Sequence, residues 1–501
     1  MTASVSLPPV AEAVRRDLPA FVRARERMMW VGGRQVAAAS GRTLPNTDPA
    51  TEEALASVPR GEAADVDAAV RAARAAFTDP AWAGMSPDRR GRVLNQIADV
   101  IEQHADELAT IDSVNMGAPH MVTTHMLAEA SETFRYYAGW PTKLSGVAVP
   151  AGNDHMLYTR KEPLGVVGVI WAWNGPMGQL PGKLAPALAA GNTVVLKPAE
   201  TASLSTLRLA ELLATTDLPA GVVNVVTGLG SEAGQALVGH PGVAKIAFTG
   251  STATGKAVQR LATDTLKRVT LELGGKSPSV VFADADLDAA ARGVAAGFLG
   301  NAGQACVAGS RVFVEEGIRE EFVQKLLKTM EAAFTPGDPL TPGTLVGPVS
   351  NKAQFERVSS YLDIARQEGA NVVTGGGRFG DHGYFIAPTL LDNVRPGMRV
   401  VREEIFGPVG VLSTFTDIDD AIAQANETDY GLAASVWTTN LTTAHRMAAA
   451  IEAGTVWVNS WGQMSTGNLP FGGYKQSGLG YEGGLEGMDA YTQAKAVRIT
   501  L

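Results

Sequence analysis

The chain has 501 residues, of which 45% are hydrophobic and 19% charged, so it is long enough for about three lobes and a large core. Its net charge of -9, with acidic and basic residues interspersed, disfavours a surface for nucleic acid or anionic membrane. No run reaches the ~18 apolar residues of a membrane span, and the N-terminus lacks the apolar core of a secretory signal. The single cysteine excludes an intrachain disulfide. We therefore expect a cytoplasmic protein without nucleic-acid or membrane partners.

Helices are expected in the first part of the chain. Residues 1–28 are rich in Ala, Arg and Pro and predict a loose tail or an extra helix. Apolar side chains then recur on one face from Asp65 to Phe77, and Asp65 is the expected helix cap. Two further stretches, 89–112 and 124–137, are also predicted to be helical.

From Leu164 onward, short apolar runs alternate with helical stretches. This alternation predicts a parallel sheet wound with helices, and ligands of such sheets bind outside the carboxyl ends of the strands. The expected strands are residues 166–170, 193–197, 222–227, 245–249 and 269–273, and the expected helices are residues 183–190, 201–215, 231–238 and 254–261. A second α/β region follows over 275–473, with strands expected at 280–282, 311–314 and 456–459.

Two glycine-rich loops are candidates for holding a phosphate. The loop Gly228–Gly234 resembles a dinucleotide fingerprint, but its last glycine comes one residue late. The loop Gly250–Lys256 follows an expected strand, as a P-loop does, yet Ala257 replaces the Ser or Thr that would hold Mg²⁺. A helix N-terminus that binds a dinucleotide pyrophosphate is the preferred interpretation, and a plain turn into a helix stays open.

Cys306 is the only cysteine and lies among glycine, alanine and glutamine in the segment Gly303–Gly309. A lone thiol is usually a small core residue, but these neighbours are too small to bury it well and allow a ligand to approach the backbone. Cys306 is therefore a candidate nucleophile. The seven histidines show no metal-ligand spacing, so no metal site is expected.

Seven short blocks occur in an order that resembles the NAD(P)-dependent aldehyde dehydrogenase superfamily. The resemblance extends from about Trp30 to the C-terminus, and the order of the blocks is far more specific than any one of them. The blocks are Trp173–Pro176, Lys197–Glu200, Phe248–Thr252, Leu271–Lys276, Gly303–Cys306, Glu403–Pro408 and Pro470–Lys475.

The resemblance implies an α/β, aldehyde-dehydrogenase-like fold. A Rossmann-type cofactor domain would occupy residues 1–141 and 163–274, and an α/β catalytic domain residues 275–473. A β-hairpin oligomerisation arm would be formed by residues 142–162 and 487–501. An isolated arm of this kind cannot bury its own apolar face, so a homodimer or homotetramer is expected.

The resemblance also assigns the reaction to three residues. Cys306 would attack an aldehyde to form a thiohemiacetal, hydride loss would give a thioester, and Glu272 would activate the water that hydrolyses it. Asn174 and the backbone N–H of Cys306 would stabilise the oxyanion. Taken alone, Glu272 would be a strand-end carboxylate paired with Lys276 or a surface lysine, and Asn174 an ordinary turn residue before Pro176.

A dinucleotide site is implied as well. Lys197 and Glu200 match the pair that holds the adenosine ribose, and a carboxylate there repels a 2′-phosphate, so NAD is the expected cofactor and NADP is less favoured. Ser251 matches the pyrophosphate contact and Glu404 the nicotinamide-ribose contact. The other cofactor-side candidates are Trp173, Lys183, Gly230, Gly250, Leu273 and Phe406.

The chain departs from the family at the walls of the substrate tunnel. Several positions that are aromatic or large and apolar in many relatives are here Gly175, Gly178, Gln179, Gly182 and Gly300. The segment 460–469, which includes Trp461, is polar and rich in glycine. This loss of bulk predicts a widened tunnel and a bulky, neutral or weakly polar aldehyde, with Gln179 or Asn468 near a polar substituent. Alternatively, Trp461 or Met177 would swing in and refill the space.

Three other functions stay open. A CoA-acylating semialdehyde dehydrogenase would typically lack the general base, so Glu272 counts against it. A non-catalytic structural protein on the same scaffold would not need Cys306, Asn174 and Glu272 together. A cysteine hydrolase is also permitted, because thioester hydrolysis is already part of the expected reaction.

Overall fold

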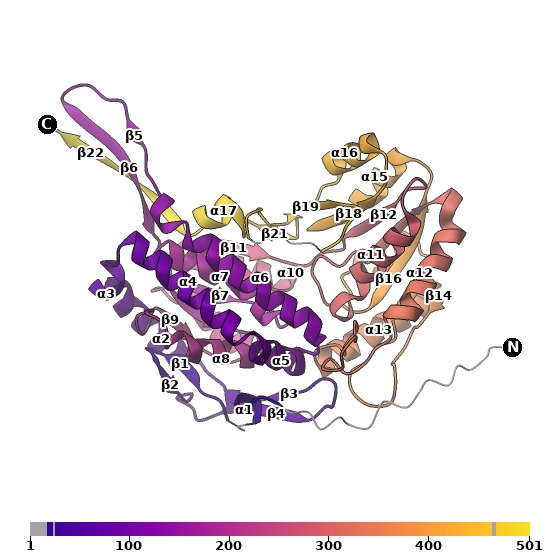
Figure 1. Ribbon diagram of the computed structural model, residues 1–501, viewed down its shortest axis with the longest axis horizontal. Coiled ribbons are helices and arrows are strands. Elements are labelled where there is room, and N and C mark those ends of the chain that lie inside the picture. Colours follow the sequence, from indigo (N-terminus) through magenta and orange to yellow (C-terminus); the bar gives the residue numbers. More distant parts are fainter. Residues whose placement is uncertain (1–17, 24–25, 463–466) are drawn as a thin grey trace.

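The computed structural model describes residues 18–23, 26–462 and 467–501, which form two lobes and a projecting arm (Figure 1). The predicted tail at 1–28 lies largely outside the described residues, within which a short helix, α1 (Ala20–Arg23), is found. In these ranges no helix has the length and apolar character needed to cross a membrane, and no group of three or more His, Cys, Asp or Glu side chains is placed to hold a metal ion.

The first lobe is built on an eight-stranded sheet. In spatial order its strands are β2 (Arg34–Val36), β1 (Met29–Val31), β9 (Val223–Val225), β8 (Thr193–Lys197), β7 (Val166–Ile170), β10 (Lys245–Thr249), β11 (Arg268–Glu272) and β21 (Gly478–Leu479). The five strands from β9 to β11 are parallel. Their order reverses between β7 and β10, and a reversal of this kind creates the crevice where doubly wound sheets bind ligands.

Helices cover both faces of this sheet, which is why every residue of β7 and β8 is buried. One layer consists of α4 (Pro87–Gln103), α5 (Ala105–Met116), α6 (His120–Ala138), α7 (Pro176–Ala189) and α8 (Leu204–Leu213). The opposite layer consists of α2 (Ala63–Thr78), α9 (Gln235–Gly239) and α10 (Thr252–Ala262).

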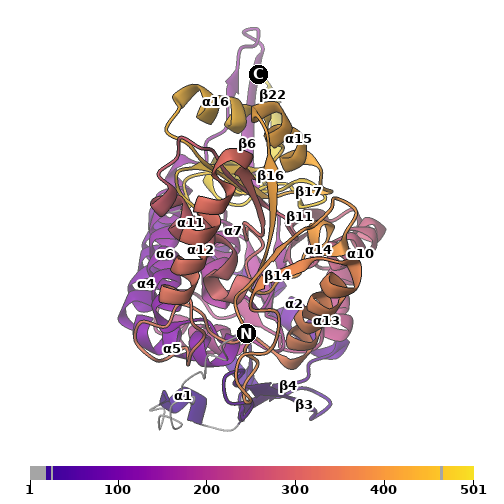
Figure 2. The same ribbon diagram turned by 90° about the vertical axis from the view of Figure 1, so that its right-hand side faces the viewer.

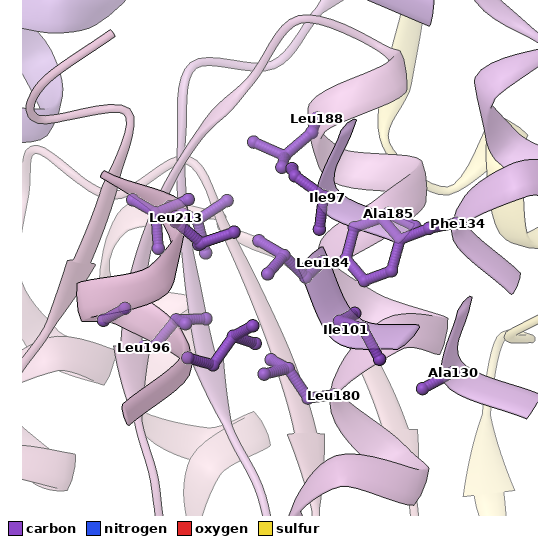
Figure 3. Close-up of a cluster of buried hydrophobic side chains, with 14 of the residues drawn as sticks. Ile97, Ile101, Ala130, Phe134, Leu180, Leu184, Ala185, Leu188, Leu196 and Leu213 are labelled. Atoms are coloured by element: carbon purple, nitrogen blue, oxygen red, sulfur yellow. The ribbon is translucent and has the colours of Figure 1, made fainter. Parts of the chain in front are cut away.

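Helix α7 is held by the largest apolar cluster of the first lobe (Figure 3). Leu180, Leu184 and Leu188 project from it into the cluster, and burial of one leucine stabilises a fold by about 1.5–3 kcal/mol. The first turn of α7 is therefore firmly placed. Its labelled neighbours in Figure 3 are Ile97 and Ile101 from α4, Ala130 and Phe134 from α6, Leu196 from β8 and Leu213 from α8.

Some helix boundaries differ from those expected. The stretch 89–112 is two helices, α4 and α5, that meet at His104. Asp65 lies at the third position of α2, where its carboxylate accepts from the backbone N–H of Glu62, the residue that caps the helix. Helix α7 begins at Pro176, seven residues before the expected start, because a proline at the first helical position needs no hydrogen-bond partner for its nitrogen.

The second lobe contains a seven-stranded sheet and faces the viewer in Figure 2. Its strands, in spatial order, are β14 (Asn371–Thr374), β15 (Thr389–Asp392), β16 (Val409–Phe415), β13 (Arg311–Glu315), β12 (Pro278–Val281), β18 (Ala433–Trp437) and β19 (Thr455–Val458). One face is covered by α11 (Leu287–Leu299), α12 (Arg319–Ala333) and α13 (Lys352–Glu368), and the other by α15 (Ile418–Asn426) and α16 (Leu441–Ala450).

A three-stranded arm extends away from the first lobe (Figure 1). Its strands are β5 (Ala148–Val149), β6 (His155–Pro163) and β22 (Thr492–Thr500), and β22 pairs antiparallel with β6 over its whole length. Several apolar side chains of the arm are exposed, namely Val147, Val149, Met156, Ile499 and Leu501.

Strand β21 returns from near the end of the chain to the edge of the first sheet, beside β11. The residue before it, Ser477, accepts the backbone N–H of Leu273 at 2.8 Å through its carbonyl and donates its hydroxyl to the carbonyl of Gly274 at 2.7 Å. The same hydroxyl accepts from the backbone N–H of Gly431 at 2.9 Å. Ser477 thus ties the loop after β11 to the second lobe.

Candidate active site

The sequence-predicted site residues come together where the two lobes meet. Trp173 and Asn174 follow β7, Lys197 ends β8, and Ser251 follows β10 by two residues. Because these strands are parallel, their carboxyl ends lie at one edge of the sheet. The two lobes are joined directly, since Nδ2 of Asn174 donates to the backbone carbonyl of Gln304 at 2.9 Å.

Cys306 is presented by a tightly packed turn after α11. Asn301 and Ala302 have positive φ angles of 51° and 53°, and Gly303 follows with 70°. Gly303 is needed here, because a Cβ atom would collide with the carbonyl of Gly407. This turn sets the direction from which the thiol meets a ligand.

Gln304 holds that turn from inside, a role that sequence reasoning missed. Its side chain is fully buried; Nε2 donates to the carbonyl of Asn301 at 3.0 Å, and Oε1 accepts from the backbone N–H of Ser350 at 2.8 Å. In the sequence Gln304 is only a polar neighbour of Cys306, and its place in the family block Gly303–Cys306 is the one available signal.

The surroundings of Cys306 favour the protonated form of its thiol. Part of the residue reaches the surface, yet burial, followed by the nearby carboxyls of Glu404 and Glu272, raises the pKa of the thiol to about 12. A reaction at sulfur therefore requires a group that takes the proton.

Glu272, at the end of β11, is 3% exposed, and in the described part of the chain neither carboxylate oxygen has a hydrogen-bond partner. Burial, together with repulsion from Glu482, raises the pKa of Glu272 well above its usual range, and Lys183 opposes this shift. The ion pair with Lys276 that a purely structural role would require is not found among the described residues. An unpartnered buried carboxyl is costly to a fold, so it points to a function.

Lys183 and Glu482 form a buried ion pair beside Glu272. Lys183 was expected to lie on the cofactor side, and the structure places it on α7, 1% exposed, with Glu482 as its partner. Glu482 lies in the loop between β21 and α17 (Gly484–Asp489), more than 200 residues after Glu272 in the chain. No local pattern in the sequence distinguishes it from other acidic loop residues.

The crevice at the reversal of strand order carries the groups expected for a dinucleotide. Ser251 caps α10, its Oγ accepting the backbone N–H of Thr254 at 3.2 Å, and the free N–H groups of that helix end suit a pyrophosphate. Gly250 has to be glycine, because a Cβ atom would lie 2.5 Å from the ring of Phe248. Gly230, by contrast, borders open space.

Lys197 and Glu200 form an ion pair of 3.2 Å beside this crevice. Lys197 is buried, and burial lowers its pKa although Glu200 opposes the shift. The Glu200 side chain is 37% exposed, so its carboxylate remains accessible to ribose hydroxyls. Lysine and carboxylate together fit a ribose, and the carboxylate would repel an added phosphate.

Two residues of the second lobe reach the same crevice. Oε1 of Glu404 accepts the backbone N–H of Gly275 at 3.0 Å, and burial raises the pKa of Glu404 to about 7. Phe406 meets Trp173 edge-to-face with ring centroids 5.4 Å apart. Leu273, another residue expected on the cofactor side, packs against Gly255 in the first turn of α10.

The predicted substrate tunnel is not simply wider at the positions that lack large side chains. A Cβ atom on Gly175 would lie 3.7 Å from Cε of Met126, and one on Gly178 would lie 3.2 Å from its Cγ. A Cβ atom on Gly300 would lie 3.8 Å from the ring of Trp461, and one on Gly182 would lie 3.3 Å from Oε2 of Glu482. Part of the lost aromatic bulk is thus replaced by the side chains of Met126, on α6, and Trp461.

The structure shows where two further residues expected at the tunnel lie. Met177 does not swing into it, because its side chain is fully buried in the apolar cluster of the first lobe. Gln179 lies near the wall, and its Nε2 donates to Oδ1 of Asn174 at 2.7 Å. Residues 463–466 of the polar segment lie outside the described residues.

Comparison with known proteins connects this site to a family. A sequence model described as "Aldehyde dehydrogenase family" matches residues 36–497. "Aldehyde dehydrogenase 1" of Tanacetum cinerariifolium is 46% identical, over 94% of this chain and 94% of that protein. A solved NAD⁺ complex of an aldehyde dehydrogenase from Bacillus cereus superposes with a TM-score of 0.94 at 44% identity, covering 96% of this chain and 98% of that one. The P. syringae AldA indole-3-acetaldehyde dehydrogenase, in complex with NAD⁺ and IAA, superposes at 0.92 with 39% identity over 95% and 96% of the two chains.

Proposed function

The chain belongs to the aldehyde dehydrogenase family, and we propose that Cys306, Glu272 and Asn174 carry its NAD-dependent oxidation of an aldehyde to a carboxylic acid. The observation that supports the proposal most is their convergence. A thiol, a buried carboxyl with no hydrogen-bond partner among the described residues and an amide donor come from three separate segments and meet between the lobes.

In the first half of the reaction, the sulfur of Cys306 bonds to the carbonyl carbon and the carbonyl oxygen becomes an oxyanion. Nδ2 of Asn174 and the backbone N–H of Cys306 donate to that oxygen. The thiol proton passes to a carboxylate, and Glu272 is the candidate because Glu404 already accepts the backbone N–H of Gly275. Bound NAD supplies the acceptor for the hydride, whose loss converts the thiohemiacetal into a thioester.

In the second half, Glu272 has released its proton and removes one from a water molecule. The hydroxide formed adds to the thioester carbonyl, and the carbon–sulfur bond then breaks. The carboxylic acid is released, and Cys306 is left as a thiolate that regains a proton. Glu272 fits this task because burial keeps its oxygens free of other partners and its pKa high enough to make it a strong base.

The cofactor is held by groups on both lobes. Lys197 and Glu200 bind the adenosine ribose, and Ser251 and Gly250 bind the pyrophosphate at the start of α10. Gly230 leaves room beside the adenosine half. The nicotinamide half is contacted by Trp173, Leu273, Glu404 and Phe406.

The substrate is a bulky aldehyde that is neutral or weakly polar. Support comes from the absence of side chains at the four glycines of the predicted tunnel, which face Met126, Trp461 and Glu482. The charged group nearest these glycines is the acidic Glu482, and the lysine beside it, Lys183, is already paired with it. An acidic semialdehyde would therefore find no free positive charge near these glycines among the described residues. Gln179 or Asn468 contacts a polar substituent.

The test is NADH formation, measured by absorbance, on acetaldehyde, succinic semialdehyde, benzaldehyde derivatives and terpenoid aldehydes, each with and without CoA. We expect NADH without CoA, with the highest kcat/KM for a larger neutral aldehyde. A strict CoA requirement would identify the acylating alternative, and a protein that hydrolyses esters but forms no NADH would identify a hydrolase. No reaction with any substrate, in a folded protein that binds NAD, would identify a structural protein.

The domain boundaries and the cytoplasmic location stay predictions.

We also propose that the arm formed by β5, β6 and β22 joins copies of this chain into a dimer or tetramer. Its exposed apolar residues are the support, since apolar side chains gathered on a projecting surface are typical of a site that binds another protein. Light scattering at micromolar concentration is the measurement, and a monomer there would remove the proposal.

A further inference from the structure

Gln179 lies on the first turns of α7 and contacts the residue assigned to the oxyanion. Its Nε2 donates to Oδ1 of Asn174 at 2.7 Å. The side chain is half-buried, and its Oε1 is shielded from solvent without a donor in the described part of the chain. The Gln179 amide is therefore committed to Asn174.

The direction of this hydrogen bond is fixed by a backbone carbonyl. The carbonyl oxygen of Gln304 can only accept, so the Asn174 atom 2.9 Å away must be nitrogen. Oδ1 of Asn174 then faces Gln179, which must present its own nitrogen. Because Gln304 is itself buried and bonded to Asn301 and Ser350, the anchor of this chain of amides is rigid.

We propose that Gln179 is a positioning residue that keeps Nδ2 of Asn174 turned toward the substrate oxygen. The proposal rests on the function proposed above, because the orientation matters only if Asn174 donates to an oxyanion. If the oxygen and nitrogen of Asn174 exchanged places, an acceptor would face the developing negative charge and stabilisation would become repulsion. The N–H groups of Gln179 oppose this exchange because they can face only the oxygen.

Gly175 gives the glutamine the space it needs. A Cβ atom at position 175 would lie 3.6 Å from Nε2 of Gln179 and 3.7 Å from Cε of Met126. A large side chain there would compete for the volume that the amide occupies. The small residue at position 175 and the amide at position 179, two departures from the family pattern, are thus parts of one arrangement.

The experiment is a double-mutant cycle with single-turnover NADH formation as its readout. Gln179→Glu replaces the donor by an acceptor and favours the exchanged orientation of Asn174, whereas Gln179→Met removes the hydrogen bond at similar size. Each is made alone and together with Asn174→Ala, because two residues that act through one interaction give non-additive losses. Gln324→Glu, on the exposed face of α12, is the control for the added charge.

We expect Gln179→Glu to slow NADH formation about 100-fold, as loss of one oxyanion donor does. Gln179→Met should slow it about threefold to tenfold, as loss of one neutral hydrogen bond does. The KM for NAD should stay unchanged, and both losses should vanish in the Asn174→Ala background.

The proposal is overturned if Gln179→Glu stays within threefold of wild type, or if its loss persists undiminished with Asn174→Ala. Should Gln179→Glu fail to fold, judged by its thermal transition, Gln179→Met carries the same cycle. A wild-type protein that forms no NADH from any aldehyde is a different result, because it removes the proposed function itself.

Discussion

The cofactor crevice and the predicted substrate tunnel share one segment, residues 173–183, but they are built in different ways. In the crevice, backbone geometry determines the shape: parallel strands end at one edge, α10 begins there, and Gly250 leaves room for the ring of Phe248. In the tunnel, side chains from α6, α7 and the Trp461 segment determine it. A family pattern in the sequence therefore carries more information about the crevice than about the tunnel.

The largest expected effect lies at Cys306, where the two regions meet. Cys306→Ala removes the only thiol, so aldehyde-dependent NADH formation should fall by at least about 10⁴-fold, as when other nucleophiles are removed. Binding of NAD should be unchanged, because the crevice is built from other residues. Steady-state NADH formation and NAD titration by fluorescence check both parts, and turnover above background would contradict the assignment.

Glu272→Gln should lower steady-state turnover by about 10²–10⁴-fold, the usual range for loss of a general base. A burst near one NADH per active site in rapid mixing would show that another group can take the thiol proton and that Glu272 is needed chiefly for the water step, whereas loss of the burst would show that Glu272 also takes the thiol proton. A variant that turns over at the full rate would show that another group activates water. Glu486→Gln, an exposed change on α17, is the matched control.

The pH profile tests the charges around Glu272. Its pKa is raised by burial and by Glu482, so the basic form exists only above that raised pKa, and kcat should increase with pH through it. Glu482→Gln removes the repulsion and leaves Lys183 to favour the charged form. The pKa of Glu272 should fall, and the rise in kcat should move to lower pH. An unchanged profile, with Glu486→Gln again as control, would show that Glu482 does not act on the base.

A smaller effect is expected in the crevice. Glu200→Gln removes the charge that would repel a 2′-phosphate, so the preference for NAD over NADP should narrow by about tenfold, the equivalent of 1.4 kcal/mol. The comparison is made from kcat/KM for both cofactors at one aldehyde concentration. Equal efficiency with NAD and NADP in the wild type would show that Glu200 has no such role.

The smallest effect is expected in the predicted tunnel, because Met126 forms only part of its wall. Met126→Ala removes the side chain that faces Gly175 and Gly178, so kcat/KM for a bulky aldehyde relative to acetaldehyde should increase about threefold to tenfold. Gly175→Phe should have the opposite effect. Improved turnover of large aldehydes by Gly175→Phe would show that the glycines do not define a wide tunnel.

The sequence predicts the secondary structure around the crevice better than the side chains around the predicted tunnel. The expected strands 166–170, 193–197 and 245–249 coincide with β7, β8 and β10, because strands buried on both faces are uninterrupted apolar runs. The predicted α/β fold and family are confirmed. The early start of α7 was missed because its first residues, Pro176 to Gly178, have little helix propensity.

The catalytic surroundings were predictable only in part. Cys306, Glu272 and Asn174 belong to the seven blocks that resemble the family, whereas Glu482 and Met126 lie outside those blocks. Both come to the site through contacts across long stretches of chain, Glu482 with Lys183 over 299 residues. Contacts of this kind depend on how helices and loops pack, and no periodicity or local spacing records them.

The tie between Ser477 and the loop after β11 has a consequence for biosynthesis. Glu272 leaves the ribosome roughly 200 residues before Ser477, and at 5–20 residues per second this interval lasts about 10–40 s. During that time β11 has no strand on its outer side, and an unpaired strand edge can associate with other chains. A nascent chain therefore carries Glu272, its proposed general base, on an unprotected edge until translation is nearly finished, so a chaperone that covers this edge would protect the chain during that interval.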